Sequence, residues 1–225
     1  MTGTLERLAG EGWLALLGGG EFTFDETLGA DRAWLAKTGP GPIGFIPAAA
    51  GSADYGRHLA TYFGETFGRE VEVIPIYRPR DGRRGRNAER ILACPAVYLG
   101  GGVADHLLDA LLGTSAFEAL VKKLREGGVV VAIAAAAQCA GAFARSIAAG
   151  ERIPALGFLP QGVVEPNFDP GHDRRLRKLL AAPGVTLGLG IPAGSAVLLG
   201  PGGAVEVEGT AFRVSGAEGD LEVIA

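Results

Sequence analysis

The fold is decided by the stretch Val129-Val130-Val131-Ala132-Ile133-Ala134-Ala135-Ala136-Ala137-Gln138-Cys139-Ala140-Gly141-Ala142. Its first part is a short apolar run rich in β-branched residues, which is typical of a strand buried on both faces of a parallel sheet. The small residues that follow predict an abrupt turn into a helix. Ala137 and Gly141 stand two residues before and after Cys139, where such a turn leaves no room for side chains. The pattern therefore predicts that Cys139 occupies the turn.

Apolar runs that end at glycine or proline recur before this stretch, and segments with helical spacing lie between them. This alternation predicts an α/β fold in three layers, a mostly parallel sheet with helices on both faces. From about Thr186 onward, short alternating runs predict antiparallel strands at the edge of that sheet. The expected strands are 13–17, 43–46, 71–76, 96–99 and 129–133, the expected helices are 55–67, 104–112, 117–125 and 174–181, and the expected C-terminal strands are 196–199, 204–207, 211–214 and 221–224.

Length and composition narrow the classes of protein. The chain has 225 residues, and we expect one domain over 1–225, because domains run to roughly 100–200 residues and α/β domains often exceed that length. A formal net charge of −4 argues against nucleic acid or anionic lipid as a partner. The sequence has only two cysteines, and no basic run leading into an apolar segment follows Met1. We therefore expect a cytoplasmic protein. The uncharged stretch 127–144 fits a buried strand, a turn and a helix start better than a membrane span.

Cys139 is the strongest candidate for chemistry. A thiol at a helix N-terminus has a lowered pKa, and the backbone N–H groups there can stabilise an oxyanion. The alternative is an inert cysteine of the core. The glycine loops 18–20 and 100–102 follow strands and should border the same pocket, since ligands bind at the carboxyl ends of parallel strands. Neither loop fits the dinucleotide pattern, which argues against nucleotide binding. We expect no cofactor and no metal.

The chain resembles a peptidase family. Gln138-Cys139-Ala140-Gly141-Ala142 is similar to the Ser-Ala-Gly-Ala turn of the serine peptidases that include dipeptidase E and cyanophycinase. Further similar segments are Gly18-Gly19-Gly20-Glu21, Phe45-Ile46-Pro47-Ala48-Ala49-Ala50, Tyr98-Leu99-Gly100-Gly101-Gly102 with the following helix Asp105-His106-Leu107-Leu108, Glu165-Pro166-Asn167-Phe168 and Gly190-Ile191-Pro192-Ala193-Gly194. The resemblance implies the class I glutamine amidotransferase-like fold.

The same resemblance implies an altered catalytic triad. It places the nucleophilic serine on Cys139, the general base on Asn167 and the orienting acid on Ala193. An amide has no basic nitrogen near neutral pH, and alanine offers nothing to orient a base. We therefore expect Asn167 and Ala193 beside Cys139 in a pocket that no longer works as a serine peptidase. The other expected pocket residues are Gly20, Glu21, Gly101, Gly102, Asp105, His106, Gln138 and Ala140, with N–H groups of Ala140 and of the 100–102 loop facing one space.

Three functions stay open at this point. The first is a degenerate peptidase that binds a small acidic or peptide-like molecule or acts as a regulatory protein. The second is a thiol hydrolase or glutaminase-like enzyme that uses Cys139 with His172 or His106, although a Pro-Gly turn should direct His172 outward. The third is a redox-responsive protein with a low-pKa Cys139. A homodimer is an open alternative to a monomer.

Arginines crowd the segment from Arg78 to Arg90. The plain interpretation is a solvated loop that runs into a helix. The functional alternative is capture of an acidic or phosphorylated partner, because arginine clusters favour carboxylates and phosphates.

Overall fold

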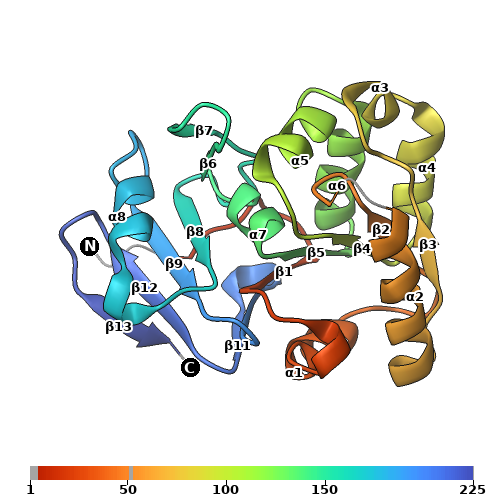
Figure 1. Cartoon of the computed structure of the whole chain (residues 1–225), viewed down its shortest axis with the longest axis horizontal. Coiled ribbons are helices and arrows are strands. Elements are labelled where there is room, and N and C mark those ends of the chain that lie inside the picture. Colours follow the sequence, from red (N-terminus) through yellow and green to blue (C-terminus); the bar gives the residue numbers. More distant parts are fainter. Residues whose placement is uncertain (1–4, 51–52, 225) are drawn as a thin grey trace.

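The computed structural model describes residues 5–50 and 53–224. Its centre is a seven-stranded sheet in the order β11-β10-β1-β5-β4-β2-β3 (Figure 1). The strands from β1 to β3 in this order run parallel, whereas β10 and β11 join antiparallel at one edge. Their bounds are β1 (Trp13–Leu17), β2 (Ile43–Ile46), β3 (Val71–Val73), β4 (Ala96–Leu99), β5 (Val129–Ile133), β10 (Ala196–Leu199) and β11 (Val205–Glu208). The predicted α/β architecture is thus confirmed, and β3 stops short of its predicted end at 76 because Pro75 cannot donate to a ladder.

Helices cover both faces of this sheet (Figure 1). Successive side chains of a strand point to opposite faces; in β1, Leu14 and Leu16 enter one core cluster, and Ala15 and Leu17 enter the other. This two-sided burial explains why the strands read as unbroken apolar runs. One face carries α1 (Leu28–Leu35) and α2 (Ala53–Phe67), and the other carries α4 (Gly85–Ala93), α5 (Ala104–Leu111), α6 (Ser115–Arg125) and α7 (Ala135–Cys139).

A second, four-stranded sheet has the order β13-β12-β9-β8. Part of the C-terminal β region therefore lies apart from the main sheet, whereas we expected all of it at the edge of that sheet. The helix α8 packs on this second sheet through Leu176, Leu179 and Leu180. The bounds are β8 (Gly162–Pro166), β9 (Leu187–Ile191), β12 (Ala211–Ser215), β13 (Leu221–Ile224) and α8 (Arg174–Leu180); the hairpin β6 (Phe143–Arg145) and β7 (Arg152–Pro154), the short helix α3 (Pro79–Gly82) and the 3-10 turns η1 (Phe22–Phe24), η2 (Pro170–His172) and η3 (Pro201–Gly203) complete the fold.

Strand register brings the loops of interest together. Leu17 of β1 pairs with Ile133 of β5, and Leu99 of β4 pairs with Ala132, so these three neighbouring strands end at the same level. The loops 18–20 and 100–102 therefore flank the turn that follows Ile133. Within the described ranges, no helix is long and apolar enough to cross a membrane; the uncharged stretch 127–144 forms β5, a turn, α7 and part of β6.

A buried carboxyl group joins α1 to α2 beneath this loop region. Asp31 is 1% exposed and accepts hydrogen bonds from Thr27 Oγ1 at 2.7 Å, Trp34 Nε1 at 2.8 Å and Tyr62 Oη at 2.9 Å. Burial raises the pKa of Asp31, and the three donors oppose this shift only in part. The network gives every polar group involved a partner, and burial makes the charged form of the carboxyl group costly.

The raised pKa of Asp31 predicts a pH dependence of stability. The folded state keeps the proton at pH values where the unfolded chain has lost it, so the stabilisation that is present below the unfolded pKa is lost as the pH rises through the folded pKa. Between the pKa of Asp31 in the unfolded chain and its higher pKa in the folded protein, the free energy of unfolding should fall as the pH rises. We expect this fall, measured by urea denaturation, to be less steep in Asp31→Asn than in the wild type. Asp31→Leu should lose about 2–4 kcal/mol, because it leaves buried donors without an acceptor.

The matched control for this prediction is Asp25→Asn, since Asp25 is exposed and lies close in sequence. Its pH profile should follow the wild type. A wild-type profile that Asp31→Asn leaves unchanged would contradict a titrating Asp31.

Candidate functional site

The sharp turn after β5 is centred on Ala134. Its backbone has φ 51° and ψ −118°, a conformation that costs a residue with a Cβ of order 1–3 kcal/mol. The Ala134 N–H donates to Leu17 O at 3.0 Å, and its carbonyl accepts from Gln138 N at 3.1 Å in the first turn of α7. A strained residue between a central strand and a helix is the geometry of a nucleophile elbow. The position that a nucleophile would need is therefore occupied by a methyl group.

Cys139 does not stand at this turn, and the sequence prediction that it does is wrong. It is the last residue of α7, more than one helical turn of about 3.6 residues beyond the elbow. Its side chain is fully buried, and Sγ lies 3.8 Å from the carbonyl oxygen of Ala104 in α5. Burial, with a smaller contribution from the charge of Asp105, raises the pKa of the Cys139 thiol far above its usual range. Cys139 is a core residue, not an activated thiol.

The small residues that suggested a turn at Cys139 have a packing role instead. A Cβ at Gly141 would approach Gly162 O to 3.0 Å, so glycine there allows the end of α7 to pack against β8. Ala140 is also fully buried, and its N–H donates to Ala136 O at 3.1 Å and Ala137 O at 3.2 Å. The prediction that the Ala140 N–H faces a pocket is therefore wrong.

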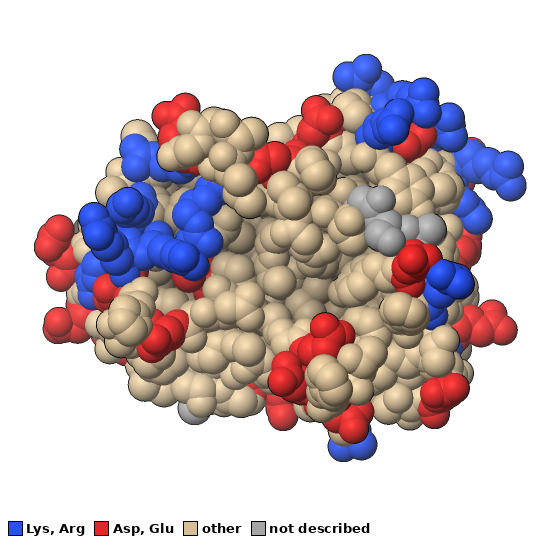
Figure 2. Space-filling view, viewed as in Figure 1, with Lys and Arg blue, Asp and Glu red and all other residues tan. Residues whose placement is uncertain are grey.

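The elbow residue borders two adjoining hollows, which we call together the elbow pocket. They have volumes of about 280 and 260 Å³, and both are lined by Ala134 and Asn167. Five of the other expected pocket residues lie here, namely Gly20, Glu21, Gly101, Gly102 and Gln138. Figure 2 shows the molecule hollowed at its centre, with basic residues to the left over α8 and acidic residues below over η1 and α1. The remaining lining residues are Gly19, Phe22, Tyr55, Ala104, Ile133, Ala135, Arg145, Ile147, Glu165, Pro166 and Arg175.

Asn167 is held in the elbow pocket by its own strained backbone. It adopts φ 48°, and its N–H donates to Gly18 O at 2.7 Å. A Cβ at Gly19, which has φ 133°, would collide with the Asn167 side chain, so only glycine at 19 allows the amide to lie over this loop. Asn167 thus adjoins Ala134 rather than Cys139. Ala193 is exposed on the connection between β9 and β10 and does not line the pocket, contrary to the expectation that it lies beside Cys139.

The Gly101 N–H, expected to face the reacting group, already has a partner. It hydrogen-bonds the phenolic oxygen of Tyr55, whose pKa is raised to about 12 by burial, with smaller contributions from the charges of Glu21 and Asp31. Tyr55 is therefore a neutral phenol at physiological pH. The pocket keeps glycine-rich walls, but this backbone donor is occupied.

The remaining predicted residues lie outside the elbow pocket. Asp105 accepts hydrogen bonds from the Ser146 hydroxyl and from Ile147 N at 2.9 Å, and these bonds, Ser146 first, lower its pKa. His106 is exposed on α5 and lines a different cavity. The His172 side chain is 86% exposed, with Nδ1 2.6 Å from Asp169 Oδ2. Neither histidine can pair with a thiol that is fully buried, so the Cys-His hypothesis is wrong, and burial likewise contradicts a low-pKa redox thiol.

Sequence reasoning missed two residues that shape the pocket. Arg145 forms an ion pair with Glu165, and its backbone N–H donates to Gln138 Oε1 at 3.0 Å. Arg175 lines the same hollow from α8. The sequence carries a signal for Arg175, since it lies at the start of a helix soon after Asn167. Arg145 lies in the β6–β7 hairpin, which the sequence pattern did not predict.

Comparison with known proteins agrees with this architecture. A peptidase from an acI-B1 Actinobacterium has a similar structure, with a TM-score of 0.74 and 19% identity over 97% of this chain and 98% of the other. A putative peptidase E protein from Listeria monocytogenes EGD-e gives a TM-score of 0.64 and 14% identity over 88% and 98% of the two chains. No curated protein matches in sequence. Peptidase family S51 matches residues 14–207, which is most of the chain, and the protein therefore belongs to that family.

Proposed function

We propose that this family member binds a small peptide-like molecule in the elbow pocket without hydrolysing it. The observation that carries the proposal is the alanine at the elbow. A methyl group cannot attack a carbonyl carbon, and Asn167 cannot accept a proton from a nucleophile near neutral pH. Among the residues that the structure describes, no serine, threonine, cysteine, lysine or histidine lines the pocket.

The charges around the pocket favour a ligand that carries both signs. Arg175 lies on one wall and forms no ion pair within the described ranges, whereas the Arg145–Glu165 pair beside it is internally neutral. On the other wall Glu21 is exposed, and its N–H is held by Glu26 Oε2 at 2.8 Å. A carboxylate directed to Arg175 and an amine directed to Glu21 would satisfy both walls, which is the charge pattern of a short peptide or amino acid.

Restoring the missing groups tests the loss of chemistry. We expect wild-type protein to leave Asp-X dipeptides uncleaved, because the elbow carries no nucleophile and Asn167 stands at the position of the general base, a group that usually contributes about 10²–10⁴-fold. Ala134→Ser with Asn167→His should gain acylation by an activated ester, detected as an added mass on residue 134 by intact-protein and peptide mass spectrometry.

Ala134→Ser alone is the control, and it should acylate more slowly because it has no base. Wild-type peptide cleavage that disappears in Cys139→Ala would contradict the proposal and support the thiol hydrolase hypothesis instead.

Removal of the unpaired cation tests the ligand class. We expect Arg175→Gln to weaken binding of an Asp-Leu dipeptide about tenfold or more, since a charge-assisted hydrogen bond contributes about 1.5–3 kcal/mol. Isothermal titration calorimetry measures this change. The matched control is Arg174→Gln, which removes the same charge from the preceding residue of α8, outside the pocket lining. Equal weakening by both variants, or no dipeptide binding by the wild type, would refute the proposed contact.

A further inference from the structure

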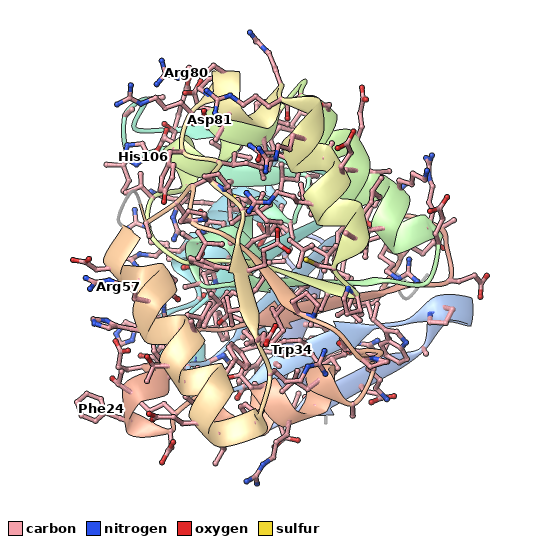
Figure 3. All side chains as sticks on the ribbon, turned by 90° about the vertical axis from the view of Figure 1, so that its right-hand side faces the viewer. Phe24, Trp34, Arg57, Arg80, Asp81 and His106 are labelled. Carbon is pink, nitrogen blue, oxygen red and sulfur yellow. The ribbon has the colours of Figure 1, made fainter. Side chains whose placement is uncertain are left out.

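A second cavity lies on the opposite face of α5 from the elbow pocket. It has a volume of about 690 Å³, within the range of small-molecule sites. Ala104 of α5 lines the elbow pocket, whereas His106 and Asp109 line the second cavity, because residues three apart share a helix face. The two sites have no lining residue in common. Figure 3 shows Arg80, Asp81 and His106 close together, far from Phe24 at the other end of the molecule.

The basic groups of this cavity have unused hydrogen-bond donors. The side chains of Arg78 and His106 form no hydrogen bond or ion pair within the described parts of the chain, and the Arg80 guanidinium only reaches Asp81 Oδ1 at 3.9 Å. By contrast, Arg90 in the following helix pairs with Glu72 at 2.7 Å. The segment 78–86 contains five arginines and one aspartate in a chain of net charge −4. Among the described residues, Asp81 is the only acidic partner of these five arginines, so the segment keeps a surplus of positive charge.

The Asp81 carboxylate serves the fold and is already engaged by its neighbours. Its carboxylate accepts from Tyr77 N at 3.3 Å and lies 3.5 Å from Arg84, and its side chain is 10% exposed. Asn87 Nδ2 donates to the Asp81 carbonyl at 2.9 Å, and Ser115 Oγ donates to the Gly82 carbonyl at 3.1 Å. These bonds fix α3 against its neighbours. The backbone that presents Arg78 and Arg80 is therefore positioned before any ligand arrives.

We propose that this cavity binds the phosphate group of a small phosphomonoester that also carries hydroxyl groups. Guanidinium groups donate paired hydrogen bonds that match phosphate oxygens, and the imidazole of His106 adds a further donor. Asp109 lines the same cavity, and its side chain forms no hydrogen bond or ion pair within the described ranges. Its carboxylate repels a second anionic group and accepts from a hydroxyl group, so it selects a ligand with one phosphate and a neutral, hydroxylated remainder.

Calorimetric titration of the full chain with sn-glycerol 3-phosphate tests this site. We expect saturable binding that Arg78→Gln with Arg80→Gln weakens about tenfold or more. The matched control is Arg83→Gln with Arg86→Gln, which removes the same charge from the same segment outside the cavity lining and should change the Kd less than about twofold. Asp109→Asn should strengthen the binding of inorganic phosphate relative to that of glycerol phosphate, because it removes a repulsive charge.

Two outcomes would overturn the proposal. One is the absence of saturable binding at about 10 mM ligand, a concentration well above a millimolar Kd. The other is equal weakening by the two double variants, which would indicate a diffuse surface for polyanions rather than a phosphate site. Arg175→Gln should leave glycerol phosphate binding unchanged, so failure of the elbow-pocket proposal and failure of this one are distinguishable.

Discussion

The turn at Ala134 is the constraint on which the rest of the site depends. Its strained backbone is held between the Leu17 carbonyl of β1 and the first turn of α7. Because β1, β5 and β4 end at one level, the same turn lies between two glycine loops. Backbone strain of this kind persists only where the surrounding structure over-determines it. The elbow is therefore a property of the sheet and does not require a functional side chain at its tip.

Much of the fold could be predicted because both periodicity and strand burial are local signals. The runs at β1, β2, β4 and β5 are apolar throughout, as expected for strands covered on both faces. The second sheet was not predictable in this way, since β8 and β9 are also buried and nothing in their composition assigns them to one sheet rather than another. Which strands pair with each other depends on contacts between residues far apart in the chain, and local sequence patterns do not reveal these contacts.

The location of the pocket could be predicted from the sequence, but the residue at the elbow could not. Asn167 and the glycine loops line the pocket as a group, whereas the register of the elbow was wrong. In the run 134–142 small residues flank two positions, Ala134 and Cys139, and only Cys139 has a reactive side chain. The small residues around Cys139 satisfy packing against β8, and those around Ala134 satisfy the turn. Because both requirements select alanine and glycine, the pattern alone could not separate them.

Helix α5 links the two proposed sites without mixing them. Its buried residues pack in the core, Ala104 lines the elbow pocket, and His106 and Asp109 line the second cavity. A peptidase scaffold whose elbow carries only a methyl group retains its pocket walls, and a second cavity can acquire binding residues independently. The proposed binding functions rest on these walls and on the charges around them, not on a nucleophile at the elbow.

The position of the elbow is the central claim, and a crystal structure of the wild-type protein tests it most directly. The account predicts a positive φ near 51° at Ala134 and a Cys139 side chain enclosed between α7 and α5, with no electron density for a modified thiol after soaking with iodoacetamide. A Cys139 thiol that opens into the pocket and carries the label, with Ala134 in extended or helical backbone, would contradict it.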